Sequence, residues 1–303
     1  MIHDELLLLW LEESEEFYSF TSIEKISNGI SSNVYRIKDE DGQTLILKHA
    51  IVDNFVAKRK IVMQYKMQEY LHDKFPVAKP FYYSIDNPIF EFPLLIMEDA
   101  SGEIKNDKKS IKKSFNLINQ LHNIKLDERF DKQRKGRNYL GYLTNRLYKQ
   151  YESRRTELSP SLDHIFAWLM QNYPEDNINC LTHNDWKMSN ILFDNREVSA
   201  VLDWELFDVS DPRMDLGIAM AYWPEDGWIS EENKYECDRQ EIVDSFKMTE
   251  KEWAFFEVLG IFRLIAVAQL GSVRHKKDIH DKIYLAMHKC ERIISENSVP
   301  SSV

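Results

Sequence analysis

The stretch Leu181-Thr-His-Asn-Asp-Trp-Lys-Met-Ser-Asn-Ile-Leu-Phe-Asp194 carries Asp185 and Asn190 just before a short apolar run. A turn signal follows, and a second apolar run at residues 198–202 leads directly to Asp203. Two short apolar runs separated by turn residues predict a β-hairpin. The hairpin would gather acidic and amide groups at one end.

This set of side chains suits phosphoryl transfer. An acceptor hydroxyl needs a carboxylate that orients it and accepts its proton, and a nucleoside triphosphate needs oxygen ligands for Mg²⁺. Asp185, then Asn190 five residues later, then Asp203 beyond the hairpin supply both requirements. Kinases use the same kind of arrangement.

The composition limits the class of protein. The chain has 303 residues, 43% of them hydrophobic, which predicts a globular fold with a large core. The formal net charge of -11 argues against a general nucleic-acid binder. It fits a small-molecule substrate with a hydroxyl, which could be cationic, although an acidic charge also simply aids solubility. Monomer and homodimer both remain open.

The cysteines and the chain start bear on the compartment. Cys180, Cys237 and Cys290 form neither a metal-binding spacing nor a disulfide framework, which favours a reducing compartment. Acidic residues, where a signal peptide would need basic ones, flank the apolar run near Met1. No stretch approaches the length of a membrane span. We therefore expect a cytoplasmic protein that does not associate with membranes.

Secondary structure changes in character along the chain. A helix is expected over residues 3–18, an antiparallel β-meander from residue 23 to a third strand ending at Lys48, and a helix over 54–73. An apolar strand over 90–97 ends the first part. Later helices are expected at 107–124, 137–153, 160–172, 211–223, 249–273 and 277–296. The pattern indicates an α+β fold with two unlike lobes around a cleft, divided as 1–98 and 99–303.

The motif order resembles the aminoglycoside phosphotransferase family of small-molecule kinases. The resemblance is carried by His183-x-Asp185-x-x-x-x-Asn190, by Asp203-Trp-Glu205 and by Asp211-Pro-x-x-Asp215. It implies a bilobal, protein-kinase-like fold with a β-rich N-terminal lobe that binds nucleotide and a mostly helical C-terminal lobe. The Asp203-Trp-Glu205 and Asp211 motifs also look like the branch fused to certain acyl-CoA dehydrogenases, where the implied acceptor is a hydroxyl on an acyl chain.

The resemblance implies roles for individual residues. Asp185 would be the catalytic base, and Asn190 and Asp203 would hold Mg²⁺. Asp215 would brace the catalytic loop, and His183 would support that loop through hydrogen bonds. ATP, or GTP, would be bound by Ser31, Lys48, Met97, Glu98 and Ala100, with Ser31 and Lys48 at the phosphates and the others around the base.

The sequence departs from the family pattern at two places. Asn28 precedes the single glycine of the phosphate loop, where relatives have two glycines. Gln64 falls where relatives place the glutamate that partners Lys48, and Glu69 lies about 140° further round the helix. A different helix register could bring Glu69 to the lysine. These departures keep a second hypothesis open, namely a nucleotide-binding pseudoenzyme or regulatory module without transfer activity.

The acceptor site is expected in the helical lobe. The acidic, aromatic run at residues 224–232 could face a cationic sugar or could be a solvated loop. Met220, Tyr222, Trp223 and Trp228 could line a pocket or could pack in the core.

Overall fold

The structure is a computed structural model, and it describes residues 11, 19–28, 32–86, 92–126, 139–153, 159–174, 176, 178–224, 235–271 and 278–297. The expected helix over residues 3–18 falls outside these ranges except for Leu11. The chain divides into two compact units. Unit 1 is Met1–Ile104 with Ile191–Leu206, and unit 2 is Lys105–Asn190 with Phe207–Val303.

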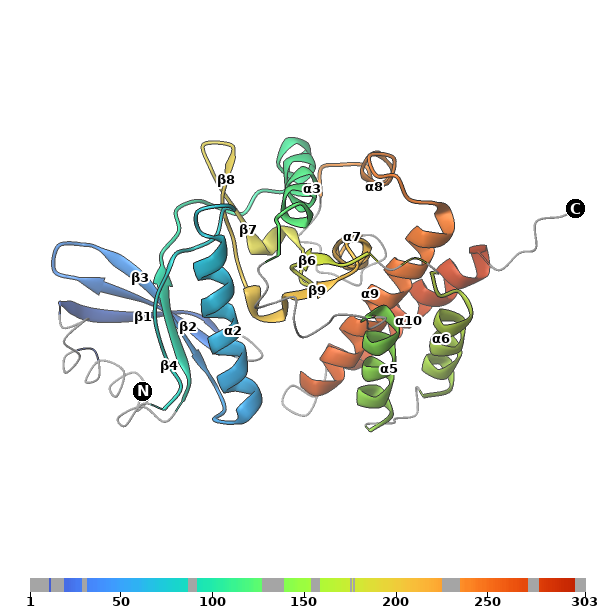
Figure 1. The fold of residues 1–303 in the computed structure, drawn as a ribbon, viewed down its shortest axis with the longest axis horizontal. Coiled ribbons are helices and arrows are strands. Elements are labelled where there is room, and N and C mark those ends of the chain that lie inside the picture. The colour runs from blue at the N-terminus through green and yellow to red at the C-terminus, as the bar shows by residue number, and fades with distance from the viewer. Residues whose placement is uncertain are drawn as a thin grey trace, which may run out of the picture. The chain divides into compact units, whose positions relative to one another are not determined.

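Unit 1 is built on a five-stranded antiparallel sheet in the order β1-β2-β3-β5-β4 (Figure 1). Its elements are β1 Phe20–Asn28, β2 Ser32–Asp39, β3 Thr44–Ala50, α2 Phe55–Leu71, β4 Pro80–Ser84 and β5 Leu94–Glu98. The predicted β-meander and the helix after it are confirmed. The third strand does not end at Lys48, because β3 pairs with β2 as far as Ala50.

The alternation of side chains along β3 explains the position of its lysine. Tyr35, Leu47 and Ile96 lie in register on neighbouring strands and are buried in one core cluster. Successive residues of a strand point to opposite faces of a sheet. Lys48 therefore points to the other face, where it meets Gln64 of α2.

A β-hairpin from late in the sequence belongs to unit 1. It comprises β7 Ile191–Asp194 and β8 Glu197–Val201 and is followed by a short 3-10 helix, η2 Trp204–Leu206. Phe193 and Glu103 exchange two backbone hydrogen bonds, and the Val201 N–H donates to the Pro76 carbonyl at 2.8 Å. These bonds explain why the hairpin groups with the sheet, whereas the sequence division at 98/99 assigns it to the helical lobe.

Unit 2 is mostly helical. Its elements are α3 Lys108–His122, α5 Tyr139–Glu152, α6 Ser159–Gln171, β6 Cys180–Thr182, η1 Met188–Asn190, β9 Asp208–Ser210, α7 Arg213–Ala221, α8 Arg239–Val243, α9 Glu250–Gly271 and α10 Asp278–Asn297. The six helices expected after residue 99 are all present, each within a few residues of its predicted ends. Four elements, β4, β6, β9 and α8, were not predicted from the sequence, because three to five residues show too little periodicity to detect.

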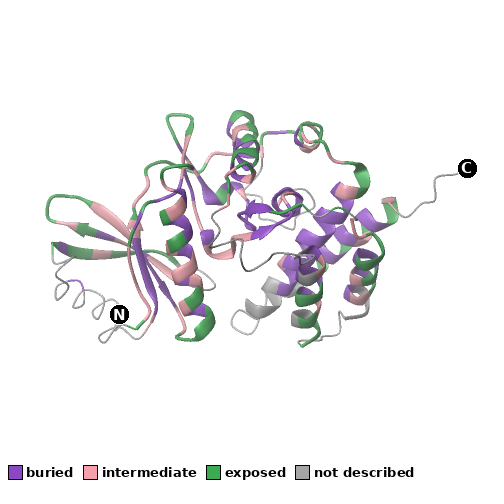
Figure 2. Ribbon diagram, viewed as in Figure 1, coloured by how far each residue is buried: buried purple, intermediate pink, exposed green. Residues whose placement is uncertain are grey.

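Helix α9 is the centre of unit 2. It packs against α5, α6, α7 and α10, and its residues from Trp253 to Ala266 are buried except for Leu264, which is partly exposed (Figure 2). Gly217 of α7 and Gly260 of α9 lie where these two helices meet. A methyl group on Gly217 would overlap the backbone of Phe256, so the two helix backbones are in direct contact.

No helix within the described part of the chain is both long enough and apolar enough to cross a membrane.

Gly217→Ala should lower the free energy of unfolding by about 3 kcal/mol, because the methyl group would meet a backbone that cannot rotate away. At an open helix position the same change would stabilise the protein by roughly 0.5–1 kcal/mol. Urea unfolding followed by circular dichroism measures the difference. Gly260→Ala, whose methyl group would lie 2.9 Å from the Gly217 carbonyl oxygen, should cost less. A Gly217→Ala protein as stable as the parent would contradict the close crossing.

Candidate active site

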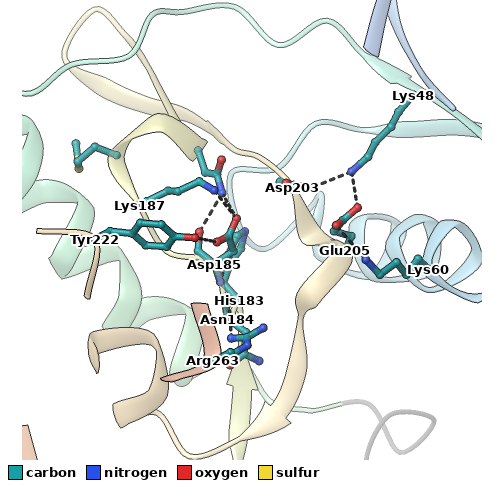
Figure 3. Close-up of polar contacts among 12 residues, drawn as sticks. Lys48, Lys60, His183, Asn184, Asp185, Lys187, Asp203, Glu205, Tyr222 and Arg263 are labelled. Atoms are coloured by element: carbon teal, nitrogen blue, oxygen red, sulfur yellow. Dashed lines mark hydrogen bonds and ion pairs between the residues drawn. The ribbon is translucent and has the colours of Figure 1, made fainter. Parts of the chain in front are cut away.

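In unit 2, polar groups surround the carboxylate of Asp185 (Figure 3). The Asn190 side-chain amide donates to Asp185 Oδ2 at 2.9 Å, and Lys187 Nζ lies 2.8 Å from the same oxygen. The Tyr222 hydroxyl donates to Asp185 Oδ1 at 2.9 Å. Both carboxylate oxygens therefore have partners, and the group is held in one orientation although Asp185 is only 6% exposed.

The backbone that carries Asp185 is fixed by a second, deeper carboxylate. Asp215 is fully buried and accepts hydrogen bonds from the backbone N–H groups of His183 and Asn184 at 3.0 and 2.6 Å. His122 Nε2 lies 3.0 Å from the same carboxylate. Burial acts to raise the pKa of Asp215, but the hydrogen bond from His122, the electrostatic attraction of the His122 and His183 rings and the Asn184 N–H outweigh it, so the pKa lies below its ordinary value. These contacts have the geometry expected of a residue that braces the loop before Asp185.

Asn184 itself has a left-handed backbone conformation, with φ of 62°. Asparagine tolerates this region better than most residues. The Asn184 carbonyl accepts a hydrogen bond from Arg263 Nη1 of α9 at 2.5 Å, and the Asp185 N–H donates to His183 Nδ1 at 3.2 Å. The strained turn is thus held from both sides, and His183 supports the loop as predicted.

In unit 1, Lys48 is the centre of a second charged cluster (Figure 3). Its Nζ lies 2.7 Å from Asp203 Oδ1, 3.2 Å from Glu205 Oε2 and 3.2 Å from Gln64 Oε1. Burial acts to lower the pKa of Lys48, but the charges of Asp203 and Glu205 raise it above its ordinary value. Lys48 is therefore a charged amine held on the face of the sheet that meets α2.

The expectation that Gln64 faces Lys48 is confirmed, and the alternative register is wrong. Gln64 is 1% exposed and bonded to the lysine, whereas Glu69 is exposed. The second carboxylate comes instead from Glu205, which also pairs with Lys60 of α2 at 3.2 Å. Burial acts to raise the pKa of Glu205, and the charges of Lys48 and Lys60 lower it below its ordinary value.

The predicted hairpin has the predicted open end. Ile191 pairs with Val201, Asn190 directly precedes the first, and Asp203 follows the second by two residues. At the closed end Asn195 and Arg196 have φ of 46° and 72°, the left-handed pair that a two-residue type I′ turn requires. Asp203 also has positive φ, 63°, a strained conformation that tends to occur at functional positions.

The residues expected around the nucleotide base lie at the end of β5 and just beyond it. Met97 Sδ is 3.5 Å from the amide of Gln68, and the Glu98 N–H donates to the Lys79 carbonyl at 2.8 Å. Ala100 is partly exposed in the loop that follows. Arg36 and Asp99 form an ion pair at 2.7 Å between β2 and this loop. Ser31 lies outside the described residues.

The expected acceptor residues separate into three groups. Met220 and Trp223 are buried in the core. The Tyr222 hydroxyl binds the carboxylate of Asp185, and Lys187 Nζ lies 5.1 Å from the centroid of the Tyr222 ring. Trp228 and nearly all of the acidic run at 224–232 lie outside the described residues.

Sequence reasoning assigned no role to Glu205, His122 or Arg263. Glu205 stands in the motif Asp203-Trp-Glu205, and His122 is the last residue of α3. Their partners are far away in sequence, so no local spacing could reveal the contacts. For Glu205 alone the sequence held an indication, because the motif at residues 203–205 places a second acidic residue near Asp203.

Comparison with known proteins defines the class. Residues 22–240 match the profile of the phosphotransferase enzyme family, abbreviated APH. The match covers more than half of the chain, so the chain belongs to this family, and the predicted resemblance is confirmed. This is a family of phosphotransferase enzymes.

Solved structures share the fold. The aminoglycoside phosphotransferase APH(4)-Ia is similar with a TM-score of 0.70 at 14% identity, over 97% of this chain and 99% of that one. A choline/ethanolamine kinase family protein from Mesorhizobium loti has a TM-score of 0.62 at 14% identity, over 99% and 96%. The predicted α+β, protein-kinase-like fold is confirmed.

Curated relatives point to a branch of the family. The chain is 30% identical over 244 residues to acyl-CoA dehydrogenase family member 11 of Mus musculus, covering 69% of this chain and 31% of the relative. It is 26% identical over 257 residues to the Homo sapiens protein of the same name, covering 75% and 33%. The chain thus spans about a third of the length of these relatives.

Replacing Asp215 by Asn should lower the free energy of unfolding by about 3 kcal/mol at pH 7, because an amide has only one oxygen for donors that now meet two. The pKa of Asp215 is depressed by folding, so its stabilising effect is complete above its unfolded pKa of about 4 and is lost as the pH falls through the folded value. The gap between parent and variant should therefore narrow below about pH 4.

Urea unfolding at pH 7, 5 and 3.5 measures this gap. Asp244→Asn, at an exposed aspartate that follows α8, is the matched control and should change little. An Asp215→Asn gap of equal size at all three pH values would contradict the assignment of the depressed pKa to this carboxylate.

Proposed function

We propose that the protein transfers the γ-phosphate of ATP to a hydroxyl group of a small molecule in a Mg²⁺-dependent reaction. The observation that carries this proposal is the fixed carboxylate of Asp185. It combines deep burial with a loop backbone bonded to Asp215 and with hydrogen bonds to both of its oxygens. A carboxylate held in this way can orient an acceptor hydroxyl and take its proton as the phosphoryl group is transferred.

Lys187 and Tyr222 both contact the Asp185 carboxylate and hold its orientation. The Lys187 ammonium lies 2.8 Å from Asp185 Oδ2, and the Tyr222 hydroxyl binds Oδ1. An incoming hydroxyl would replace one of these contacts. In that event Lys187 could turn toward the transferred phosphoryl group, where a positive charge stabilises the transition state.

The nucleotide would bind through residues of unit 1. Lys48 would contact the α- and β-phosphates, as the strand lysine of kinases does, and the backbone of Glu98 and Ala100 would contact adenine beside Met97. A variant of APH(4)-Ia in complex with ADP and hygromycin B has the same fold as this chain, which supports nucleotide binding here.

Asn190 and Asp203 are the residues proposed to hold Mg²⁺. They offer an amide oxygen and a carboxylate, the hard donors that Mg²⁺ prefers. The Asn190 NH₂ group is bonded to Asp185, which leaves its side-chain oxygen for the ion. The bound ion would neutralise charge on the phosphates.

Two acceptor classes follow from the relatives. The solved neighbours include an enzyme in complex with hygromycin B, and the curated relatives are acyl-CoA dehydrogenase family members. The first favours a cationic aminoglycoside-like acceptor and the second a hydroxyacyl acceptor. The identity of 22–30% to the second group, against 13–14% to APH(4)-Ia, favours the hydroxyacyl class.

A nucleotide-binding module without transfer activity is the second candidate. Gln64 beside Lys48 favours it, because an amide supplies no charge for positioning the lysine. The two candidates differ in one result, since only the enzyme releases ADP when an acceptor is added.

Asp185→Ala should abolish acceptor-dependent ADP release, with a loss of at least about 100-fold, while leaving Mg-ATP affinity nearly unchanged. A coupled assay with aminoglycosides, choline, simple sugars and hydroxyacyl-CoA esters measures turnover, and calorimetry measures binding. Asp244→Ala, far from the site in sequence and exposed, is the control. Turnover retained in Asp185→Ala would refute the catalytic assignment.

Asp203→Ala should raise the Mg²⁺ concentration needed for half-maximal turnover by about tenfold or more, because one of two protein oxygen ligands is lost. Titration of MgCl₂ at fixed ATP in the same assay measures it, and EDTA should stop turnover of the parent. The same Mg²⁺ requirement in parent and variant would count against Asp203 as a ligand.

A further inference from the structure

We propose that Glu205 is the positioning residue of Lys48, in the place of the helix glutamate that Gln64 replaces, and that Lys60 joins Glu205 to α2. In kinases the strand lysine pairs directly with a glutamate of the helix. Here the order of charges is reversed, because the helix supplies a lysine and the carboxylate stands between two lysines. The inference deepens the proposed function and rests on Lys48 acting at the nucleotide phosphates.

The geometry of Glu205 suits this role. Each of its two oxygens pairs with a different lysine. Oε2 lies 3.2 Å from Lys48 Nζ, and Oε1 lies 3.2 Å from Lys60 Nζ. The side chains of Glu205 and Lys48 are 13% and 8% exposed. An ion pair so little exposed to water is screened much less than one at the surface. Glu205 can therefore hold the ammonium group of Lys48 in place.

Asp203 is the competing partner, because it lies closer to Lys48, at 2.7 Å. Its side chain is 37% exposed, however, and it is the residue proposed to hold Mg²⁺. A carboxylate that binds a cation gives up part of its attraction for a neighbouring lysine. Glu205 is then the carboxylate that remains with Lys48 when Mg-nucleotide is bound.

Helix α2 presents both of its contributions from one face. Lys60 and Gln64 are four residues apart and therefore neighbours on the helix surface. Lys60 binds Glu205, and the Gln64 amide oxygen accepts from Lys48. The residue pair ties α2 to η2 and β3 at once, which agrees with the packing of α2 against η2. A glutamate at position 64 is thus not needed for a charged link between helix and strand.

The test is to move the carboxylate. Glu205→Gln removes the charge, and the double variant Glu205→Gln with Gln64→Glu restores it at the usual helix position. Calorimetry measures the affinity of the full chain for Mg-AMP-PNP, Mg-ADP and adenosine. Asp86→Asn is the matched control, because Asp86 also pairs with a lysine of α2, Lys58, at 2.7 Å but does not contact Lys48.

We expect Glu205→Gln to weaken Mg-AMP-PNP and Mg-ADP binding about tenfold and to leave adenosine affinity unchanged, because only the phosphates would meet Lys48. The double variant should recover to within about threefold of the parent. A loss of adenosine affinity to the same extent would show a merely structural role and overturn the proposal. So would unchanged Mg-ADP affinity in Glu205→Gln, or a double variant no better than the single one.

Lys60→Met provides a second route should Glu205→Gln not fold, as judged by circular dichroism. Lys60→Met removes the ion pair between Glu205 and α2, so it should lower the affinity for Mg-ADP and leave the affinity for adenosine unchanged. An affinity for Mg-ADP equal to that of the parent would overturn the proposal. The parent and Asp185→Ala separate the two levels of inference. A parent that binds no Mg-AMP-PNP refutes both, whereas a parent that binds it but transfers nothing refutes only the transferase activity.

Discussion

The hydrogen bonds from the His183 and Asn184 backbone to the buried carboxylate of Asp215 fix the loop that carries Asp185. A charge in the core is tolerated only with close partners, and Asp215 has two N–H donors and His122. The left-handed turn at Asn184 follows from this constraint, because the chain must present consecutive N–H groups to one carboxylate. The Asp185 side chain is oriented as a result, before any substrate binds.

In unit 1 a buried positive charge plays the corresponding role. Lys48 is placed by strand alternation on the face that meets α2, and three side-chain oxygens surround it. In each unit, therefore, a buried charge holds together segments that are distant in the sequence. The residues to which we assign a function are members of these clusters or direct neighbours of them, so stability and the proposed activity would depend on the same contacts.

Much of this organisation could be predicted from the sequence. The helices have strong periodicity, and the hairpin has turn residues between two apolar runs, so both follow from local rules. Asp185, Asn190 and Asp203 stand in a motif with fixed spacing. The partner of Lys48 could not be predicted in the same way, because Glu205 is separated from it by 157 residues. The helix position pointed to Gln64, and only the folded chain brings the second carboxylate to the lysine. The short strands β6 and β9 escaped for a related reason, since their pairing is not local.

The backbone contact between Gly217 and Gly260 has a consequence for the exchange of amide hydrogens. At this crossing α7 and α9 leave no room for water or for side-chain rearrangement. Amides there can meet solvent only when the two helices separate, which requires the core of unit 2 to open as a whole. They should be among the slowest to exchange in deuterated buffer. Since α9 also carries Arg263, which donates to the Asn184 carbonyl, the helix expected to exchange most slowly is also the helix that anchors the loop of Asp185.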